Sequence, residues 1–191
     1  MRDPNEGWSR SGFALSRLGM GYNLNATPLQ ILGLMSVVCN QGKLIKPRIV
    51  REILTEDHER VSASLDSEVV ENVLSARTAG KLKSALIHAV REGTGKNAIV
   101  DGYVVGGKTG TTMKVIEGHY RKNRNLASFL GFIGTESEPA LIGMVIADDP
   151  QSEGKRHGGS VAAPIFKEIA EAGMYHFGVR RLASVDMEMA N

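Results

Sequence analysis

Residues 102–112 read GYVVGGKTGTT, and this stretch predicts a β-strand that carries hydrogen-bonding and charged side chains. Tyrosine and valine, which fill 103–105, favour strands. Alternate side chains of a strand share a face, so Thr109 and Thr111 project together while Lys108 begins on the opposite face. Lys108 therefore depends on strand twist and on its long side chain to act beside the two threonines.

The glycines around Lys108 leave the backbone of this strand uncovered. Gly107 and Gly110 carry no side chain that would keep another chain away, so an extended ligand can lie against the strand edge and pair with it. Two hydroxyls and nearby N–H groups at such an edge could hold a carboxylate. Lys-Thr-Gly is also a common tripeptide in ordinary strands, and the tripeptide alone favours that plainer interpretation.

A phosphate-binding loop fits the same letters. Residues 102–109 satisfy G-x-x-x-x-G-K-[ST], and the apolar run that ends in Asp148 and Asp149 resembles a strand that would hold magnesium. A phosphate loop requires a helix that begins at its Lys-Thr pair, so that N–H groups point at the phosphates. Here 110–112 read Gly-Thr-Thr, and no helical period follows before Leu126. The sequence therefore favours the strand over an NTPase.

The remaining patterns predict an α+β fold, in which a mainly antiparallel sheet has helices packed on it. The expected elements are a helix over 27–39, a β-rich piece over 48–54, a helical region over 68–90, strands over 103–112, 126–133 and 140–147, and a helix over 161–175. The polar stretch 114–125 is expected to be a solvated hairpin loop rather than a phosphate or nucleic-acid site, and 134–139 suit a second hairpin.

Two helix starts have recognisable capping residues. Thr27 and Gln30 form a Thr-x-x-Gln capping box around Pro28, which is tolerated at the first helical position. Ser160 is expected to cap the last helix, with Pro164 in its first turn.

Composition excludes several classes of protein. The 191 residues contain 42% hydrophobic residues and a formal charge of +2, which is ordinary for a globular domain and argues against binding nucleic acid by bulk charge. The single cysteine, Cys39, excludes an intrachain disulfide, and it is expected to be a small buried residue rather than a catalytic thiol. The five histidines show no metal-ligand spacing, and no metal or cofactor is implied.

Short motifs flank the 102–112 strand in a fixed order, from residue 21 to about residue 170. They are Gly21-Tyr22, Ala26-Thr-Pro-Leu-Gln30, Asn40-Gln-Gly42, Pro47, Gly93-Thr-Gly95, Gly106-Gly-Lys-Thr-Gly-Thr111, Gly118-His-Tyr120, Ala127-Ser-Phe129, Gly131-Phe132, Asp149-Pro150, Gly158-Gly159 and Ala162-Ala-Pro-Ile-Phe166. Each motif is weak alone. The ordered set resembles class B penicillin-binding proteins, especially the division- and elongation-type D,D-transpeptidases.

The resemblance implies an enzyme whose serine, in a Ser-x-x-Lys motif, attacks the D-Ala-D-Ala carbonyl of a peptidoglycan stem peptide. D-Ala leaves, an amine of a neighbouring stem peptide receives the acyl group, and β-lactams acylate the same serine. Lys108 is implied to join the proton network around a Ser-x-Asn serine. Thr109, Gly110 and Thr111 are implied to bind substrate, with both hydroxyls on its carboxylate and the Thr111 N–H as an oxyanion donor.

The nucleophile that the family requires is not expected within this sequence. Ser-x-Asn is absent, and Ser152-Glu-Gly-Lys155 is the only Ser-x-x-Lys. With 14 serines and 10 lysines in the chain, chance alone gives about 0.7 such matches. The match also follows the last strand, whereas the family's nucleophile precedes the motifs found here, so Ser152 and Lys155 are expected to be loop residues.

The expected organisation is an irregular segment over 1–26, the C-terminal part of a penicillin-binding domain over 27–177, and a tail over 178–191. The expected partners are stem peptide, β-lactams and the N-terminal part of the same domain. The resemblance implies a location at the cytoplasmic membrane, facing the periplasm or exterior, through an anchor that this sequence lacks. Alternatives are a non-catalytic fragment or binding module, then a D,D-carboxypeptidase or β-lactamase, and last an NTPase.

Overall fold

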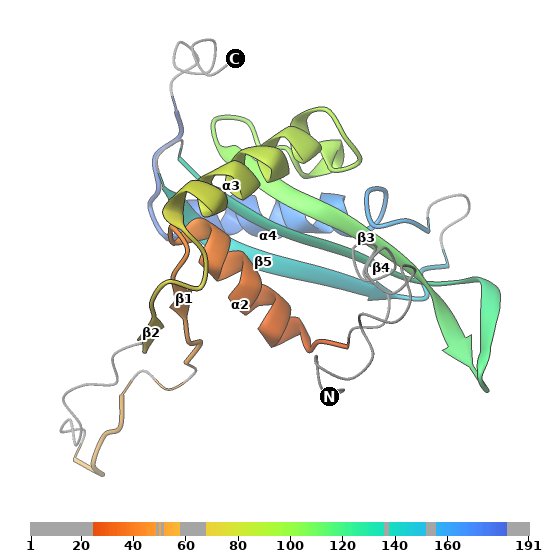
Figure 1. Cartoon of the computed structure of the whole chain (residues 1–191), viewed down its shortest axis with the longest axis horizontal. Helices are drawn as coiled ribbons and strands as arrows, with labels where there is room; N and C mark the ends of the chain where they lie inside the picture. The colour runs from red at the N-terminus through yellow and green to blue at the C-terminus, as the bar shows by residue number, and fades with distance from the viewer. Residues whose placement is uncertain are drawn as a thin grey trace. The chain divides into compact units, whose positions relative to one another are not determined.

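A computed structural model describes residues 25–48, 50, 52–57, 68–135, 138–151 and 156–182 (Figure 1). The chain forms two compact units, Met1–Ile31 and Leu32–Asn191. The first unit contains the start of helix α2 (Pro28–Cys39). There the Thr27 N–H donates to Gln30 Oε1 at 2.8 Å and the Gln30 N–H donates to Thr27 Oγ1 at 3.3 Å. The predicted capping box is therefore confirmed.

The sheet of the larger unit has three antiparallel strands in the order β3-β4-β5. They are β3 (Val104–Ile116), β4 (His119–Gly134) and β5 (Pro139–Asp148). The three predicted strands are confirmed, but the first two extend through the polar stretch expected to be a loop. Glu117 and Gly118 form the turn between them, with φ of 52° and 78°. Positive φ at both residues is the backbone geometry of the tight hairpin turn that matches strand twist.

Two short elements differ from the sequence-based expectation. Residues 48–54 form no regular strand among the described positions; instead β1 (Leu44–Ile45) pairs antiparallel with β2 (Val69–Val70). The helical region expected from 68 begins only at α3 (Ala76–Arg91), where the Ser75 hydroxyl caps the Thr78 N–H at 3.1 Å. Strands of two residues are too short to show a period of two, which is why the sequence gave no sign of them.

Helix α4 (Ala162–His176) packs on the sheet through its first and middle turns. Phe166 lies above Gly131 and Gly143, which face each other across β4 and β5. A Cβ at either glycine would lie 3.1 Å from the Phe166 ring, so the paired glycines make room for that ring. The ring of Phe129 is 4.8 Å from that of Phe166, centroid to centroid.

The core around this contact collects the sheet, α4 and the end of α3. Its buried members are Val90, Ala98, Val100, Tyr103, Val105, Phe129, Ile133, Ala162, Ala163, Phe166, Ala170 and Met174. Ser160 does not cap α4 as expected. Its hydroxyl donates to the His157 carbonyl at 3.1 Å, and the residue before the helix is Val161, with no side-chain cap.

The residues after α4 return to the start of β3. The Tyr103 hydroxyl donates to the Val179 carbonyl at 2.8 Å, and the Leu182 N–H donates to the Gly102 carbonyl at 2.8 Å. The Arg181 guanidinium lies 6.0 Å from the centre of the Tyr103 ring. These contacts hold the end of the described chain against β3, while the domain boundaries expected at 26/27 and 177/178 stay predictions.

No helix within the described ranges is both long and apolar enough to cross a membrane.

Candidate functional site on strand β3

The four residues predicted for the site lie together in the middle of β3. Lys108, Thr109, Gly110 and Thr111 pair in register with residues 130 down to 127 of β4. β3 is the outer strand of the sheet, and in the described part of the chain no other strand pairs with its second edge. The strand edge that the sequence predicted is therefore present.

The phosphate-loop geometry is absent. β3 continues without interruption through Lys108 and Thr109 to Ile116, so no helix begins at the Lys-Thr pair. A helix N-terminus is what would bring N–H groups to the phosphates. The interpretation of 102–109 as a nucleotide-binding loop is therefore wrong.

Two segments that are distant in sequence converge on the threonines of β3. The hydroxyl oxygens of Thr94 and Thr109 are 2.7 Å apart, and Thr94 belongs to the Gly-Thr-Gly turn that follows α3. The Gly158 N–H, in the turn that leads into α4, donates to the Thr111 hydroxyl oxygen at 3.1 Å. The Asn97 side-chain amide donates to the Gly159 carbonyl at 2.7 Å and so joins the two turns.

Glycine is required where the second turn meets the sheet. A Cβ at Gly158 would overlap the Ser128 carbonyl oxygen and would lie 2.6 Å from the Gly110 carbonyl oxygen. A Cβ at Gly159 would overlap the Thr94 carbonyl oxygen. The Gly158-Gly159 pair therefore lets backbone pack directly on backbone, and it places the Gly158 N–H at Thr111.

Gly110 also has a packing reason to be glycine. A Cβ at this position would lie 2.6 Å from the Ser128 hydroxyl oxygen on β4. Lys108 is exposed, and its ammonium donates to the Thr109 carbonyl at 3.2 Å. Thr111 is exposed too, so the hydroxyl and the ammonium are both open to a ligand from solvent.

Sequence reasoning predicted β3 but did not predict the roles of Thr94, Asn97 or Gly158. The Gly93-Thr-Gly95 and Gly158-Gly159 motifs were visible as letters only, because nothing local indicates that each turn meets a strand threonine. The predicted loop residues Ser152 and Lys155 lie outside the described residues. Within those residues, no group of three or more His, Cys, Asp or Glu side chains could hold a metal ion.

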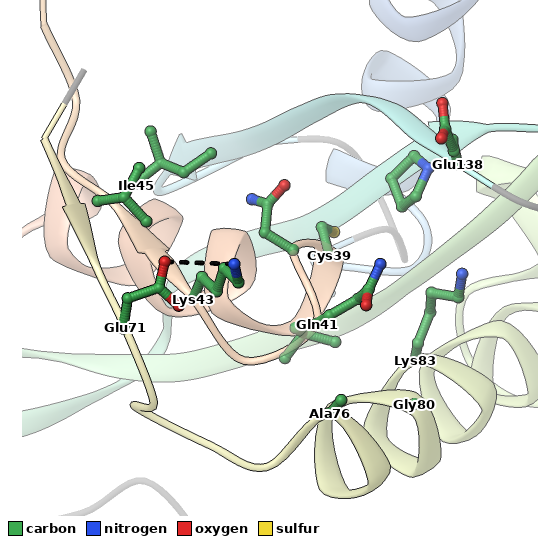
Figure 2. A pocket seen from close by; sticks show the side chains of 13 residues that line it. Cys39, Gln41, Lys43, Ile45, Glu71, Ala76, Gly80, Lys83 and Glu138 are labelled. Carbon is green, nitrogen blue, oxygen red and sulfur yellow. Dashed lines mark ion pairs between the residues drawn. The ribbon is translucent and has the colours of Figure 1, made fainter. Parts of the chain in front are cut away.

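A separate cavity of about 790 Å³ lies between the end of α2, α3 and the β4–β5 turn. Figure 2 shows Cys39 at this cavity, with the Lys43–Glu71 ion pair of 3.2 Å along one side and Lys83 on α3. Burial raises the pKa of the Cys39 thiol to about 11, although the positive charge of Lys83 opposes part of this shift. A thiol with that pKa is almost fully protonated at neutral pH, which argues for the structural role expected of Cys39 rather than a catalytic one.

Comparison with known proteins agrees with this geometry. Residues 2–171 match the family model of the penicillin binding protein transpeptidase domain. Stage V sporulation protein D of Bacillus subtilis is 35% identical over 176 residues, which are 88% of this chain and 27% of that protein. The probable peptidoglycan D,D-transpeptidase PenA of Neisseria flavescens is 32% identical over 163 residues, 85% of this chain and 37% of that protein.

Solved structures give the same result. Penicillin binding protein 3 of Mycobacterium tuberculosis, in complex with ampicillin, matches 96% of this chain and 42% of that chain, with 30% identity and a TM-score of 0.79. The transpeptidase domain of Burkholderia pseudomallei penicillin-binding protein 3 matches 92% of this chain and 50% of that chain, with 25% identity and a TM-score of 0.76.

This chain thus spans between about a quarter and one half of the length of the relatives described above. The family match nevertheless covers most of its own residues, includes β3, α3 and both turns that meet on the threonines, and agrees with the antiparallel sheet and its helices. The chain belongs to the penicillin-binding protein transpeptidase family.

Proposed function

We propose that this chain supplies the substrate-binding strand of a serine D,D-transpeptidase, which cross-links the stem peptides of peptidoglycan. The observation that carries the proposal is the convergence of Thr94 and Gly158 on Thr109 and Thr111, at an open strand edge, in a chain of the transpeptidase family. The names of the relatives support the activity, and the ampicillin complex of one neighbour supports β-lactam binding.

The terminal D-Ala-D-Ala of a stem peptide would lie extended along the free edge of β3. Its carboxylate would accept hydrogen bonds from the Thr109 and Thr111 hydroxyls, which share a face of the strand. The Thr111 N–H would donate to the oxygen of the attacked carbonyl, where negative charge develops in the transition state. β-Lactams would bind in the same way, since they also carry a carboxylate beside a reactive carbonyl.

Lys108 would act on protons rather than on the carboxylate. Its ammonium is exposed and bonds only to a neighbouring backbone carbonyl among the printed contacts, so it can turn toward a catalytic serine. A positive charge there would lower the cost of removing a proton from that serine and would return a proton to the leaving amine.

We propose that the nucleophilic serine comes from a part of the transpeptidase domain outside this sequence, together with the membrane anchor. The support is that this chain matches half or less of the solved domains, while Ser152-x-x-Lys155 is its only Ser-x-x-Lys motif. Such an enzyme would face the periplasm or cell exterior. The second candidate, a non-catalytic binding module, rests on the same missing motif.

Binding of a substrate fragment to the isotopically labelled chain tests the strand directly. Acetyl-D-Ala-D-Ala should shift the NMR amide signals of 108–111 and of Gly158, and it should leave signals at the Cys39 cavity unchanged. Shifts confined to that cavity, or no shifts at millimolar ligand, would refute the assignment of β3 as the substrate strand.

A further inference from the structure

The hydrogen bonds around the three threonines Thr94, Thr109 and Thr111 (the threonine cluster) determine where their protons can go. A hydroxyl has one proton to donate and lone pairs with which to accept. The Gly158 N–H can only donate, so its 3.1 Å bond makes Thr111 Oγ1 an acceptor on that side. The Thr111 proton is therefore left for an acceptor outside the protein.

The other two threonines follow the same count. Thr94 Oγ1 and Thr109 Oγ1 are 2.7 Å apart, so one of their two protons lies between them. Whichever hydroxyl donates in that bond, the proton of the other remains available. The cluster thus presents two outward O–H donors, one from Thr111 and one from the Thr94–Thr109 pair.

The Gly158 N–H is held in place by more than its bond to Thr111. The Gly158 carbonyl accepts the N–H groups of Ala162 and Ala163 at 2.9 Å each, which fixes this peptide to the first turn of α4. Its Cα packs on the backbone of Gly110 and Ser128 with no room for a Cβ. Strand and helix therefore set the direction of this donor before any ligand arrives.

We propose, resting on the proposed function, that Gly158 and Thr94 are positioning residues that orient the threonine hydroxyls as donors and so make the site select an ionised carboxylate. A carboxylate accepts hydrogen bonds at both oxygens, whereas a carboxamide accepts at one oxygen and presents donors at its nitrogen. Two preset donors match the first group and not the second, and charge-assisted bonds add to the difference. The site therefore discriminates a free peptide C-terminus from an amidated one.

The test compares acetyl-D-Ala-D-Ala with its C-terminal amide, each titrated by NMR into the same labelled chain. The parent should bind the acid at least about tenfold more tightly than the amide. Gly158→Ala pushes the turn off the strand, so it should weaken binding of the acid by about tenfold and leave binding of the amide unchanged. The matched control is Gly80→Ala on α3, where a Cβ meets nothing within 4 Å.

A second variant covers the case in which Gly158→Ala does not fold. Thr94 is exposed, so Thr94→Val is expected to fold, and it removes the partner that fixes the Thr109 hydroxyl. It too should reduce the preference for the acid, whereas Thr94→Ser should restore it. A merely structural role would weaken acid and amide alike.

The outcomes separate this inference from the proposed function. If the parent prefers the acid and both Gly158→Ala and Thr94→Val keep that preference, the orienting role is refuted while the substrate strand stands. Equal weakening of acid and amide in the variants refutes it as well. If the parent binds neither ligand at β3, the proposed function fails, and the inference fails with it.

Discussion

Replacing Thr111 by valine should slow acylation of the complete transpeptidase domain by penicillin and should also lower its stability. Valine keeps the β-branched shape that strands favour and removes only the hydroxyl. The lost contact to the ligand carboxylate is a charge-assisted hydrogen bond, worth about 1.5–3 kcal/mol, which corresponds to roughly tenfold to over a hundredfold in rate. The Thr111 N–H belongs to the backbone and survives, so acylation should fall without vanishing.

The stability effect comes from a second bond of the same hydroxyl. Gly158 is buried, and its N–H would lose the acceptor that now lies 3.1 Å away. Leaving a buried donor unsatisfied costs about 1–3 kcal/mol, with the lower end expected here because Thr111 itself is exposed to water. Thr111→Ser is the matched control, since it keeps a hydroxyl for both bonds and should stay close to the parent in rate and in melting temperature.

The assay is the second-order rate of acylation of each variant by a fluorescent penicillin, with thermal melting as the control for folding. Lys108→Ala should be slower than Thr111→Val, because it removes a charge from the proton-transfer network as well as a donor. If Thr111→Val and Lys108→Ala both remain folded and acylate at the parent rate, β3 is not the substrate-binding edge.

Three other predictions follow from the fold and its cavities. Phe166→Ala should destabilise the domain by about 3–5 kcal/mol in chemical denaturation, because the ring is 3% exposed over the paired glycines, while Tyr175→Ala, 89% exposed on the same helix, should change stability by less than about 0.5 kcal/mol; equal losses would refute this packing. Alkylation of Cys39 at pH 8 should be about ten- to a hundredfold slower than that of a free thiol and should rise until about pH 11, since its raised pKa keeps it protonated, and alkylation as fast as that of a free thiol would contradict the burial. ATP should not bind to the chain in calorimetry, and a micromolar dissociation constant abolished in Lys108→Ala would restore the nucleotide-binding interpretation.

The same raised pKa gives the sign of a stability change with pH. The folded state holds the Cys39 proton more tightly than the unfolded chain, whose thiol has its ordinary pKa of 9.0. This contribution to stability is fully present below pH 9 and is lost as the pH rises through about 11.

The sequence could predict elements whose residues carry a strong local preference. The strand at 103–112 was predictable because tyrosine and valine precede the Lys-Thr-Gly letters, and helix α2 was predictable from its capping box. The extension of the hairpin through 114–125 was not, since its polar side chains face solvent and its apolar residues show no clear alternation. Ser160 was mistaken for a cap because its hydroxyl turns back to the His157 carbonyl instead of reaching the helix.

The site was only half visible in the same way. Lys108, Thr109 and Thr111 were found because they adjoin one another on a strand. The contact between Gly158 and Thr111 joins residues 47 apart, and it depends on a backbone approach that only the folded sheet creates. Thr94 gave no signal either, because a threonine in a Gly-Thr-Gly turn has the same letters whether it meets solvent or another threonine.

The measurement that tests the central claim most directly is the site of penicillin attachment. A fluorescent penicillin should leave this chain unlabelled, and it should label the complete transpeptidase domain at a serine outside these 191 residues, as mapped by peptide mass spectrometry. In the labelled domain, chemical-shift changes should fall on Thr109 and Thr111. Stable labelling of this chain at Ser152, or a labelled domain whose β3 signals do not change, would contradict the account.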